Sequence, residues 1–562
     1  MLLAAVRGAA NVRCASAAAL LPRARLLAAK TLPPAKGSGR VVLADQKARK
    51  GGRARLCGGC GTMVVKAGEP SRVLAIGGAE AVEELGLHTK AGRFSDVLDS
   101  NGFLCERCKA LRHGNVWHAY DALEDLDPKV FNDQLKHIVR RRRFGLCIKV
   151  VDASDFEGTI VSSVRSAIGT IPIILAVNKI DLMPRASERD LKYMQRRLRD
   201  RGLNCTDVHA VSAHTGAGVD ELAEGVLRSL GGRDVFVIGA ANVGKSSLVR
   251  ALTQVIAENV KYNEQSTSAK KRKQRLLDMP VTSSHLPGTT LQAIRVPCFA
   301  SDRHALWDTP GIISDKSLAY SLFPSHLMEP LAQPQPIEVS KTFRVRRGES
   351  LVLEGSWMQS PQASAQAPAF GRVDVTALTP PNKYVEMIIY SPPAIAPRVV
   401  PTSEAPCTVD ICDHAIRNVQ IKMSGDASQL AQRTRQRVPL VHVNDVAPKQ
   451  KSNGWYAADV CFATIGWVQL ECSSAFTVAP WNVKGSLWAK REPPMYPSNL
   501  LELVKRDEAT SKSDYLQEPH QLDDKQTRKE RLQHAAQEGR HISNHIRQGR
   551  DRNDSGWWDD DY

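Results

Sequence analysis

The sequence predicts an α/β protein in which a parallel sheet with covering helices lies between a small cysteine-containing domain and a β-rich domain. Apolar runs of strand length alternate with amphipathic segments over residues 121–325, a pattern typical of a parallel sheet. Two Cys-x-x-Cys pairs precede this region. Short runs of alternating polar and apolar residues follow it, over residues 326–487, which indicates antiparallel strands.

The first 44 residues contain no Asp or Glu but carry several Arg and Lys among Ala and Leu. This composition predicts an organellar targeting leader, for the mitochondrial matrix rather than the plastid because Ser and Thr are few. A basic arm that binds RNA is the alternative. In either case residues 1–44 are left out of the predicted fold.

Four of the twelve cysteines form the two pairs, which are separated by 44 residues. The spacing predicts a tetrahedral zinc site in a treble-clef-like knuckle within residues 45–120. Disulfides or unpaired thiols are the alternatives. The predicted Zn²⁺ ligands are Cys57, Cys60, Cys105 and Cys108.

The central region alternates strands with helices in a definite order, interrupted by a basic insertion at 261–278. The expected strands lie in GLCIKVVDASDF, IPIILAVNKIDL, CTDVHAVSAHTG, RDVFVIG, TLQAIRVPCFA and HALWDTPGI. GVDELAEGVLRSL and the segment after GAANVGKS are the expected helices. Beyond the β-rich region, residues 488–562 form a charged, extended tail with a predicted helix around 523–548.

Residues 239–246, GAANVGKS, lie between a strand and a helix, as a phosphate-binding loop does. Its glycines allow backbone N–H groups to wrap phosphates, Lys245 would reach the β and γ phosphates, and Ser246 would bind Mg²⁺. The predicted contacts are Gly239, Asn242, Val243, Gly244, Lys245, Ser246 and Ser247.

Asn178, Lys179 and Asp181 follow another apolar strand in the pattern N-K-x-D. The Asp181 carboxylate could accept two hydrogen bonds from N1–H and the exocyclic amine of guanine, an arrangement that adenine does not offer. Lys179 would pack over the base, and Asn178 would tie this loop to the phosphate loop. Taken alone, N-K-x-D is as typical of a turn or a helix start as of a guanine site. The later SAHTG adds Ser212 and Ala213, where a backbone amide would face guanine O6.

DTPG, at residues 308–311, ends a further strand and supplies Asp308, which would hold Mg²⁺ through water, and Gly311, whose N–H would sense a γ-phosphate. LPGTTLQ offers Thr290 as the switch threonine, with Thr289 as the alternative. We therefore expect GTP or GDP with Mg²⁺, and expect Ser246, Thr290 and Asp308 at the metal.

The two base-reading motifs precede the phosphate loop, which is the reverse of the usual order in guanine-nucleotide switch proteins. Reading from 234 to about 320 and then from 145 restores that order. In a parallel α/β domain these loops all lie at one edge of the sheet, so a circular permutation can preserve the site. The joint would be the helix GVDELAEGVLRSL with the GGRD that follows it.

The cysteine pairs together with VVDASDFEGT, VNKIDLMP, GAANVGKSSL, LPGTTL and DTPGI resemble the YqeH family of circularly permuted GTPases over roughly residues 55–320. The resemblance continues patchily in FRVRRGESLVLEG and ADVCFATIGWVQL. It implies a GTPase that assists maturation of the mitochondrial small ribosomal subunit. The implied partners are small-subunit rRNA, ribosomal proteins or other assembly factors, with the protein monomeric in the particle.

Ile312 stands where a related switch protein has a water-orienting Gln, and an apolar side chain cannot polarise water, so slow intrinsic hydrolysis is expected. Asn242 matches an Asn that helps bind K⁺ in potassium-stimulated relatives. A loop-capping role is its alternative. The residues predicted to act in catalysis are Lys245, Thr290, Asp308, Gly311 and Asn242.

The chain carries 76 Lys and Arg against 59 Asp and Glu, a formal net charge of +17, which favours a polyanionic partner. The basic runs at 140–143 and 270–275 could contact rRNA phosphates or be a solvated face. The sequence contains no run of about 18 apolar residues, so we expect no membrane span. Two other functions stay open: a non-hydrolysing scaffold that binds GTP or GDP, and an organellar GTPase that does not act on ribosomes.

Overall fold

The structure is a computed structural model, and the residues it describes from 145 onward belong to one compact unit, Ala44–Tyr562. The four predicted zinc ligands and the basic runs at 140–143 and 261–278 lie outside the described residues. The described residues are 55–56, 63–64, 145–160, 164–184, 188–200, 202–259, 290, 293–299, 304–312, 314, 316–318, 328–339, 342–358, 367–411, 436–452, 454–496 and 530–538.

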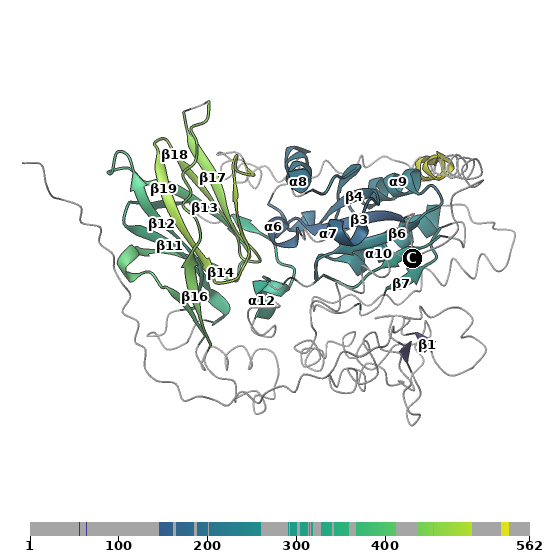
Figure 1. The fold of residues 1–562 in the computed structure, drawn as a ribbon, viewed down its shortest axis with the longest axis horizontal. Coiled ribbons are helices and arrows are strands. Elements are labelled where there is room, and N and C mark those ends of the chain that lie inside the picture. The colour runs from purple at the N-terminus through teal and green to yellow at the C-terminus, as the bar shows by residue number, and fades with distance from the viewer. Residues whose placement is uncertain are drawn as a thin grey trace, which may run out of the picture. The chain divides into compact units, whose positions relative to one another are not determined.

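A six-stranded sheet with the order β5-β4-β3-β6-β8-β7 forms the centre of the nucleotide-site region, here called the central domain (Figure 1). The edge strand β7 runs antiparallel to β8, so the sheet is mixed and the prediction of a wholly parallel sheet is wrong at this edge. The connection over 297–305 is too short for the crossover helix that a parallel pair requires. The strands are β3 (Gly145–Asp152), β4 (Ile173–Asn178), β5 (Asp207–Ala210), β6 (Asp234–Gly239), β7 (Ile294–Val296) and β8 (Leu306–Asp308).

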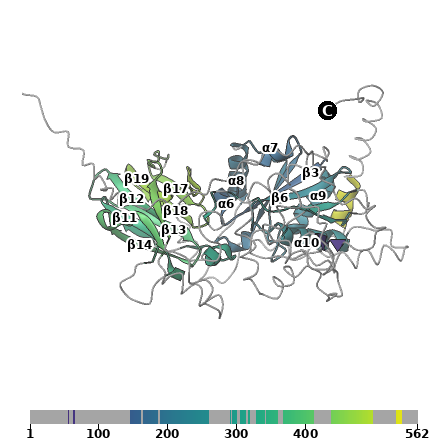
Figure 2. The same cartoon turned by 60° about the horizontal axis from the view of Figure 1, so that its bottom comes forward.

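Helices cover both faces of this sheet, which explains why its central strands are apolar without alternation (Figure 2). On β3, Cys147 and Val151 pack with Leu198 of α8, whereas Ile148 and Val150 pack with Leu222 of α9 on the other face. The helices are α6 (Phe156–Thr159), α7 (Val164–Ile168), η2 (Ile180–Leu182), α8 (Glu188–Asp200), α9 (Val219–Ser229) and α10 (Lys245–Asn259).

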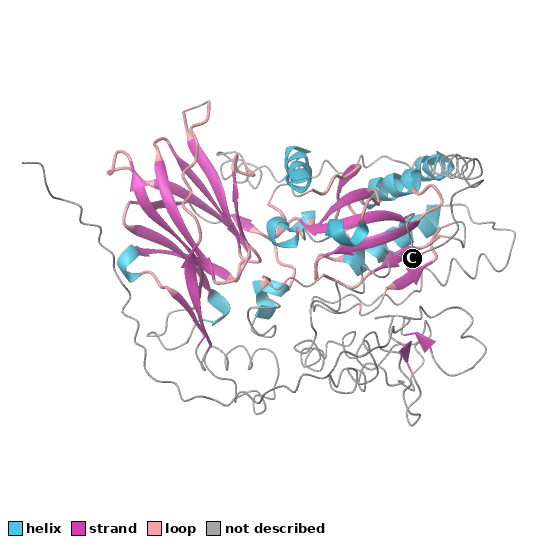
Figure 3. Ribbon diagram, viewed as in Figure 1, coloured by secondary structure: helices cyan, strands magenta, loops and turns pink. Residues whose placement is uncertain are grey.

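The C-terminal domain is a β-sandwich of two antiparallel sheets, and strands dominate it in Figure 3. One sheet has the order β10-β13-β18-β17-β20 with β9 paired to β13, and the other has the order β14-β11-β12-β19-β16-β15. Its elements are α12 (Glu329–Ala332), β9 (Glu338–Val339), β10 (Phe343–Val345), β11 (Glu349–Gly355), η5 (Ser356–Met358), β12 (Ala369–Leu378), β13 (Val385–Ser391), β14 (Ile395–Pro401), η6 (Thr402–Glu404), β15 (Thr408–Ile411), β16 (Gln436–His442), β17 (Tyr456–Phe462), β18 (Gly466–Cys472), β19 (Phe476–Val483) and β20 (Trp488–Arg491). The strand β20 lies wholly beyond residue 487, where the sequence placed the end of the domain, and belongs to it because it completes the sheet beside β17.

The sheet that contains β17 is buried on both faces. Val460 and Phe462 point into the sandwich core. Cys461 and Trp467 face the other way and join an apolar cluster that includes Phe156 of the central domain. The two domains therefore share a hydrophobic interface as well as a covalent link.

Residues 530–538 of the tail are helical, within the range for which the sequence predicted a helix. Leu532 and Ala535 are buried in the apolar cluster of α9 and α10, and Arg531 Nε lies 3.3 Å from Glu224 Oε1 on α9. This part of the tail is packed against the central domain rather than extended, because Leu532, Ala535 and Ala536 have an apolar helix face to cover. No helix within the described ranges has the length and apolarity needed to cross a membrane.

Near the N-terminus, β1 (Arg55–Leu56) pairs antiparallel with β2 (Met63–Val64). The segment between these two strands contains Cys57 and Cys60. Among the described residues no group of His, Cys, Asp and Glu has the arrangement of a metal site.

Candidate nucleotide-binding site

The phosphate loop connects β6 to α10, and its shape depends on glycine. Gly244 has φ +83°, and a Cβ there would lie 2.4 Å from Nδ2 of Asn178. A Cβ on Gly239 would lie 2.5 Å from the carbonyl oxygen of Val150. No side chain fits at either position, so the two glycines let the loop approach the neighbouring strand ends closely. Ser247, predicted as a further contact, lies in the first turn of α10.

Lys245 is buried at the start of α10, and its Nζ donates a hydrogen bond to the carbonyl oxygen of Ala240, 2.7 Å away. Burial lowers the pKa of Lys245 to about 8, partly offset by the carboxylate of Asp308. The amine is thus held by one neutral carbonyl group. A phosphate would be a stronger acceptor for it.

Three of the predicted metal residues meet beside the phosphate loop, although they come from separate parts of the chain. Ser246 Oγ donates to Asp308 Oδ2 at 2.7 Å, and Thr290 Oγ1 donates to the same oxygen at 3.0 Å. The two hydroxyl oxygens are 3.1 Å apart. The structure thus brings the three side chains to one point, and their binding of a metal stays a prediction.

This cluster fits Mg²⁺. Asp308 is buried, its Oδ1 has no hydrogen-bond partner among the described residues, and burial raises the pKa of its carboxyl group. Carboxylate and hydroxyl oxygens are the donors that Mg²⁺ prefers, with the remaining positions filled by water and phosphate. Ser246, Thr290 and Asp308 would hold the ion, which would neutralise charge on the phosphates.

Asn178 joins the base-reading loop to the phosphate loop. Its Nδ2 donates to the carbonyl oxygen of Val243 at 2.8 Å, and its Oδ1 accepts from the backbone N–H of Ala213 at 3.0 Å. One buried amide therefore fixes three segments relative to one another. Asp181 is exposed on η2, free to meet a base, while the buried Ser212 accepts the backbone N–H of Thr215.

The segment after DTPG is paired with the phosphate loop. The N–H of Ile312 donates to the carbonyl oxygen of Gly239 at 3.0 Å, and its carbonyl oxygen accepts the N–H of Ala241 at 2.9 Å. A Cβ on Gly311 would lie 2.9 Å from Cα of Ala241 and 3.1 Å from Nζ of Lys245. Gly311 is therefore required for this close approach, and the Ile312 side chain is buried.

Asn242 adopts a left-handed conformation with φ +61°. Its Nδ2 donates to the carbonyl oxygen of Ala332, 2.5 Å away, in α12 at the entrance to the C-terminal domain. This bond does not use Oδ1, which is the atom that a bound cation would require.

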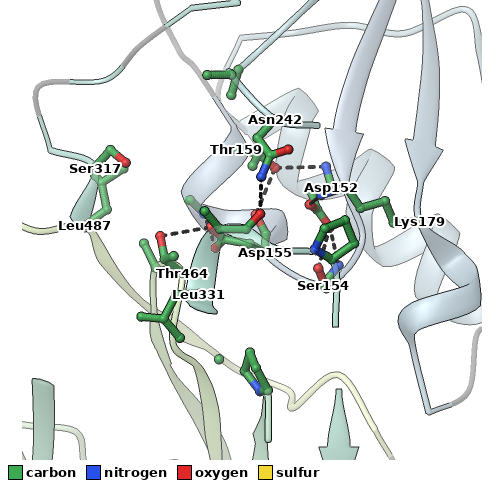
Figure 4. Close-up of a pocket in the computed structure, with 18 of the residues that line it drawn as sticks. Asp152, Ser154, Asp155, Thr159, Lys179, Asn242, Ser317, Leu331, Thr464 and Leu487 are labelled. Atoms are coloured by element: carbon green, nitrogen blue, oxygen red, sulfur yellow. Dashed lines mark hydrogen bonds and ion pairs between the residues drawn. The ribbon is translucent and has the colours of Figure 1, made fainter. Parts of the chain in front are cut away.

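A polar cavity lies beside the phosphate loop, between the central domain and the sandwich (Figure 4). Its walls include Asp152, Asp155, Lys179, Asn242 and Thr464. Sequence reasoning assigned no role to Asp152 or Asp155, although both stand in the quoted DASDF at the end of a strand. It also passed over Lys149, a fully buried lysine in the middle of β3.

Comparison with known proteins agrees with this geometry. Residues 234–327 match the family model described as 50S ribosome-binding GTPase. The chain is 29% identical to YqeH of Bacillus subtilis (strain 168) over 263 residues, 46% of this chain and 63% of that protein. It is 32% identical to NO-associated protein 1, chloroplastic/mitochondrial, of Arabidopsis thaliana over 218 residues, 37% of this chain and 36% of that protein.

A third relative is Nitric oxide-associated protein 1 of Homo sapiens, 26% identical over 249 residues, 36% of this chain and 33% of that protein. The chain thus spans less than two thirds of the length of each of these relatives. The matched family model covers both the phosphate loop and DTPG, so these residues form a P-loop GTPase domain.

Proposed function

The chain belongs to the YqeH family of GTPases, and from this premise we propose that it binds and hydrolyses GTP while assisting assembly of the mitochondrial small ribosomal subunit. The observation that carries the nucleotide part is the bridge made by Asn178. This side chain connects the base-reading loop to the phosphate loop at 2.8 Å and to the SAHTG turn at 3.0 Å. A guanine nucleotide needs these three segments in one place.

We also propose that the central domain is a circularly permuted GTPase domain. The strand that leads into NKID, β4, precedes the phosphate-loop strand β6 in the chain, and both flank β3 in the sheet. Parallel pairing through β3 brings their carboxyl ends to one edge. The turn at Gly231 and Gly232, with φ values of +47° and +74°, connects α9 to β6 and would be the joint.

In the proposed reaction, the phosphate-loop amides and Lys245 bind the phosphates, and Gly311 senses the γ-phosphate. Mg²⁺, once bound by Ser246, Thr290 and Asp308, supplies charge neutralisation. Ile312 has no polar group with which to orient water, so hydrolysis is slow in isolation. A K⁺ ion at Asn242 would add the positive charge that an arginine supplies in other GTPases.

The proposed partners follow from the family and the charge. The matching family model is named for GTPases that bind the 50S ribosome. The resemblance to YqeH implies the small subunit instead. Both subunits therefore have to be tested. The net charge of +17 suits rRNA. The acid-free leader, and the chloroplastic or mitochondrial location in the name of the Arabidopsis relative, support an organelle, and we favour the mitochondrial matrix.

Two further parts of the proposal concern the flanking regions. Cys57, Cys60, Cys105 and Cys108 would bind Zn²⁺, with β1 and β2 on either side of the first pair. Hydrolysis would reorient the C-terminal domain, because the segment after DTPG leads into it and Asn242 already contacts Ala332 at its entrance. The GTP form would bind the pre-ribosomal particle and the GDP form would leave it.

The test measures GTP hydrolysis by the full chain in K⁺ and in Na⁺, alone and with mitochondrial small or large subunits or their precursors. We expect slow turnover alone, acceleration by K⁺, and further acceleration with small-subunit particles. Co-sedimentation with GTP but not with GDP should accompany it. Acceleration by the large subunit only would overturn the small-subunit assignment, and equal sedimentation of both forms would overturn the release step.

The buried Ile312 favours one alternative, a scaffold that binds GTP or GDP without turning it over. In that case the nucleotide would bind with full affinity and remain GTP under every condition of the assay. The same measurement therefore separates the two functions.

A further inference from the structure

Lys179, the lysine of NKID, is held in an unusual conformation. Its backbone is left-handed with φ +65°, which is uncommon for any residue other than glycine. Two backbone hydrogen bonds hold the turn around it. The N–H of Ile180 donates to the carbonyl oxygen of Val211 at 3.4 Å, and the N–H of Leu182 donates to the carbonyl oxygen of Lys179 at 3.0 Å. The side chain is also fixed, because Nζ lies 2.6 Å from Oδ2 of Asp152.

Asp152 is oriented before any ligand arrives. Its Oδ1 accepts hydrogen bonds from the backbone N–H of Ser154 at 2.9 Å and from Ser154 Oγ at 2.6 Å. Its own N–H donates to Thr159 Oγ1 at 3.0 Å. The carboxylate is therefore the fixed member of the pair, and the flexible lysine is the member that becomes aligned.

The position of the pair explains what the alignment does. Asp152 and Asn178 are register partners at the carboxyl ends of β3 and β4, so the bond draws the Lys179 stem across the gap between two adjacent strand ends. In Figure 4 the two side chains lie together on the cavity wall near Asn242 of the phosphate loop. A lysine bound in this way cannot turn its amine to the phosphates, and it presents its methylene groups instead.

We propose that Asp152 is a positioning residue for the guanine base, acting through Lys179. This inference rests on the proposed function, since it gives the lysine of NKID the base as its ligand. The carboxylate does not contact the base. It holds the long lysine side chain in one rotamer before the nucleotide binds, so less side-chain entropy is lost on binding.

The test is a double-mutant cycle on GDP affinity, measured by calorimetry with Mg²⁺ on the full chain. Asp152→Asn should weaken GDP binding about tenfold, and Lys179→Met should weaken it at least as much. In the Lys179→Met background, Asp152→Asn should change the affinity by less than about twofold. Additive losses would overturn the proposal, because they would mean that Asp152 acts independently of the lysine.

Asp155→Asn is the matched control. Asp155 lies in the same loop, but it caps α6 through Gly158 N–H at 3.2 Å and meets Thr464 Oγ1 at 3.5 Å, and no ion pair joins it to Lys179 among the described residues. An Asn can make both of these contacts, so GDP affinity should be unchanged. A loss equal to that of Asp152→Asn would show a general effect of the loop and would contradict the proposal.

Thermal unfolding of the nucleotide-free proteins completes the test. If the ion pair only braced β3 against β4, Asp152→Asn would lower the melting temperature while GDP affinity stayed at the wild-type value, and the proposal would be wrong. Failure of the wild-type protein to bind GDP at all is a different result. It would remove the proposed function itself.

Discussion

Buried charges are handled differently in the β-sandwich and in the central domain. In the sandwich they occur as ion pairs: Arg491 Nε lies 3.0 Å from Asp459 Oδ2, and Arg372 Nη2 lies 2.9 Å from Asp374 Oδ2. Each arginine also stacks on a tryptophan of the same domain. The sandwich therefore supplies its own counter-charges.

At the nucleotide edge of the central domain the buried charges have no such partners. Lys245 forms no ion pair within the described part of the chain. Asp308 Oδ2 accepts from two hydroxyl groups, and no ion pair joins this carboxylate to a described residue. An unpaired buried charge costs several kcal/mol, so its presence points to a ligand that supplies the missing charge. Lys179 with Asp152 is the exception, a pair that joins the base-reading loop to the end of β3.

The largest effect is expected from breaking a pair in the sandwich. Arg491→Met leaves the buried Asp459 without its partner, and should lower the free energy of unfolding of the C-terminal domain by about 4 kcal/mol. Adding Asp459→Leu should recover most of this loss. Denaturant unfolding followed by tryptophan fluorescence, to which Trp467, Trp481 and Trp488 of the sandwich contribute, measures both changes. A loss below about 1 kcal/mol would show that the pair is not a structural necessity.

The opposite sign is expected for Lys149, on which Cys147, Cys205 and Lys245 act and no carboxylate does among the described residues. Burial lowers its pKa from 10.5 to about 8, so the unfolded chain binds the proton more tightly than the folded protein does. Lys149→Met should therefore stabilise the protein, by on the order of 3 kcal/mol at pH 7.

This gain has a defined dependence on pH. It should be complete below about pH 8 and should shrink as the pH rises toward 10.5, where the lysine is neutral in both states. The free energies of unfolding of the wild type and of Lys149→Met at pH 7 and near pH 10 measure this gain. The cysteines titrate in both proteins, so their contribution largely cancels in the difference. A constant difference over this range would mean that Lys149 carries no buried charge.

Lys245→Met should separate ligand binding from folding. We expect GDP affinity to fall about a hundredfold, or about 2.7 kcal/mol, because a phosphate contact is lost. The stability of the nucleotide-free protein should not fall, since the one partner of the amine among the described residues is a neutral carbonyl group. Lys316→Met, at an exposed residue of the neighbouring cavity wall, is the control. Equal losses of affinity in the two variants would contradict the assignment.

The smallest effect concerns the contact between the two regions. Thr464, at the tip of the β17–β18 hairpin, has φ +71°, which is strained for a β-branched residue. Thr464→Gly also loses the hydroxyl bond to Asp155 but removes the strain, so on balance it should raise stability by up to about 1 kcal/mol. Thr464→Val keeps the strain and loses the hydroxyl bond to Asp155, so it should be less stable than the wild type. Melting temperatures that rank Val above Gly would show that the strain is not real.

The sequence predicted the site where backbone geometry leaves little choice. Gly244 and Gly311 admit no side chain, and NKID, GAANVGKS and DTPG each end a strand, so their meeting followed from a parallel arrangement. The antiparallel orientation of β7 was missed because an apolar run predicts a strand but not whether it runs parallel or antiparallel to its neighbour. The role of Asp152 was missed because an Asp at a strand end is common, and only the 2.6 Å contact with Lys179 reveals its target.

The central claim is that a base-reading loop encoded before the phosphate loop forms one guanine site with it. Asp181→Asn tests this claim most directly, because an amide offers a donor where guanine requires an acceptor, while xanthine carries a carbonyl group at that position. Affinities for GDP, XDP and ADP should be measured by calorimetry on both proteins. We predict that, of the three nucleotides, the wild type binds GDP but not XDP or ADP. The variant should lose affinity for GDP and gain affinity for XDP. Unchanged GDP binding in the variant, or equal binding of ADP by the wild type, would contradict the account.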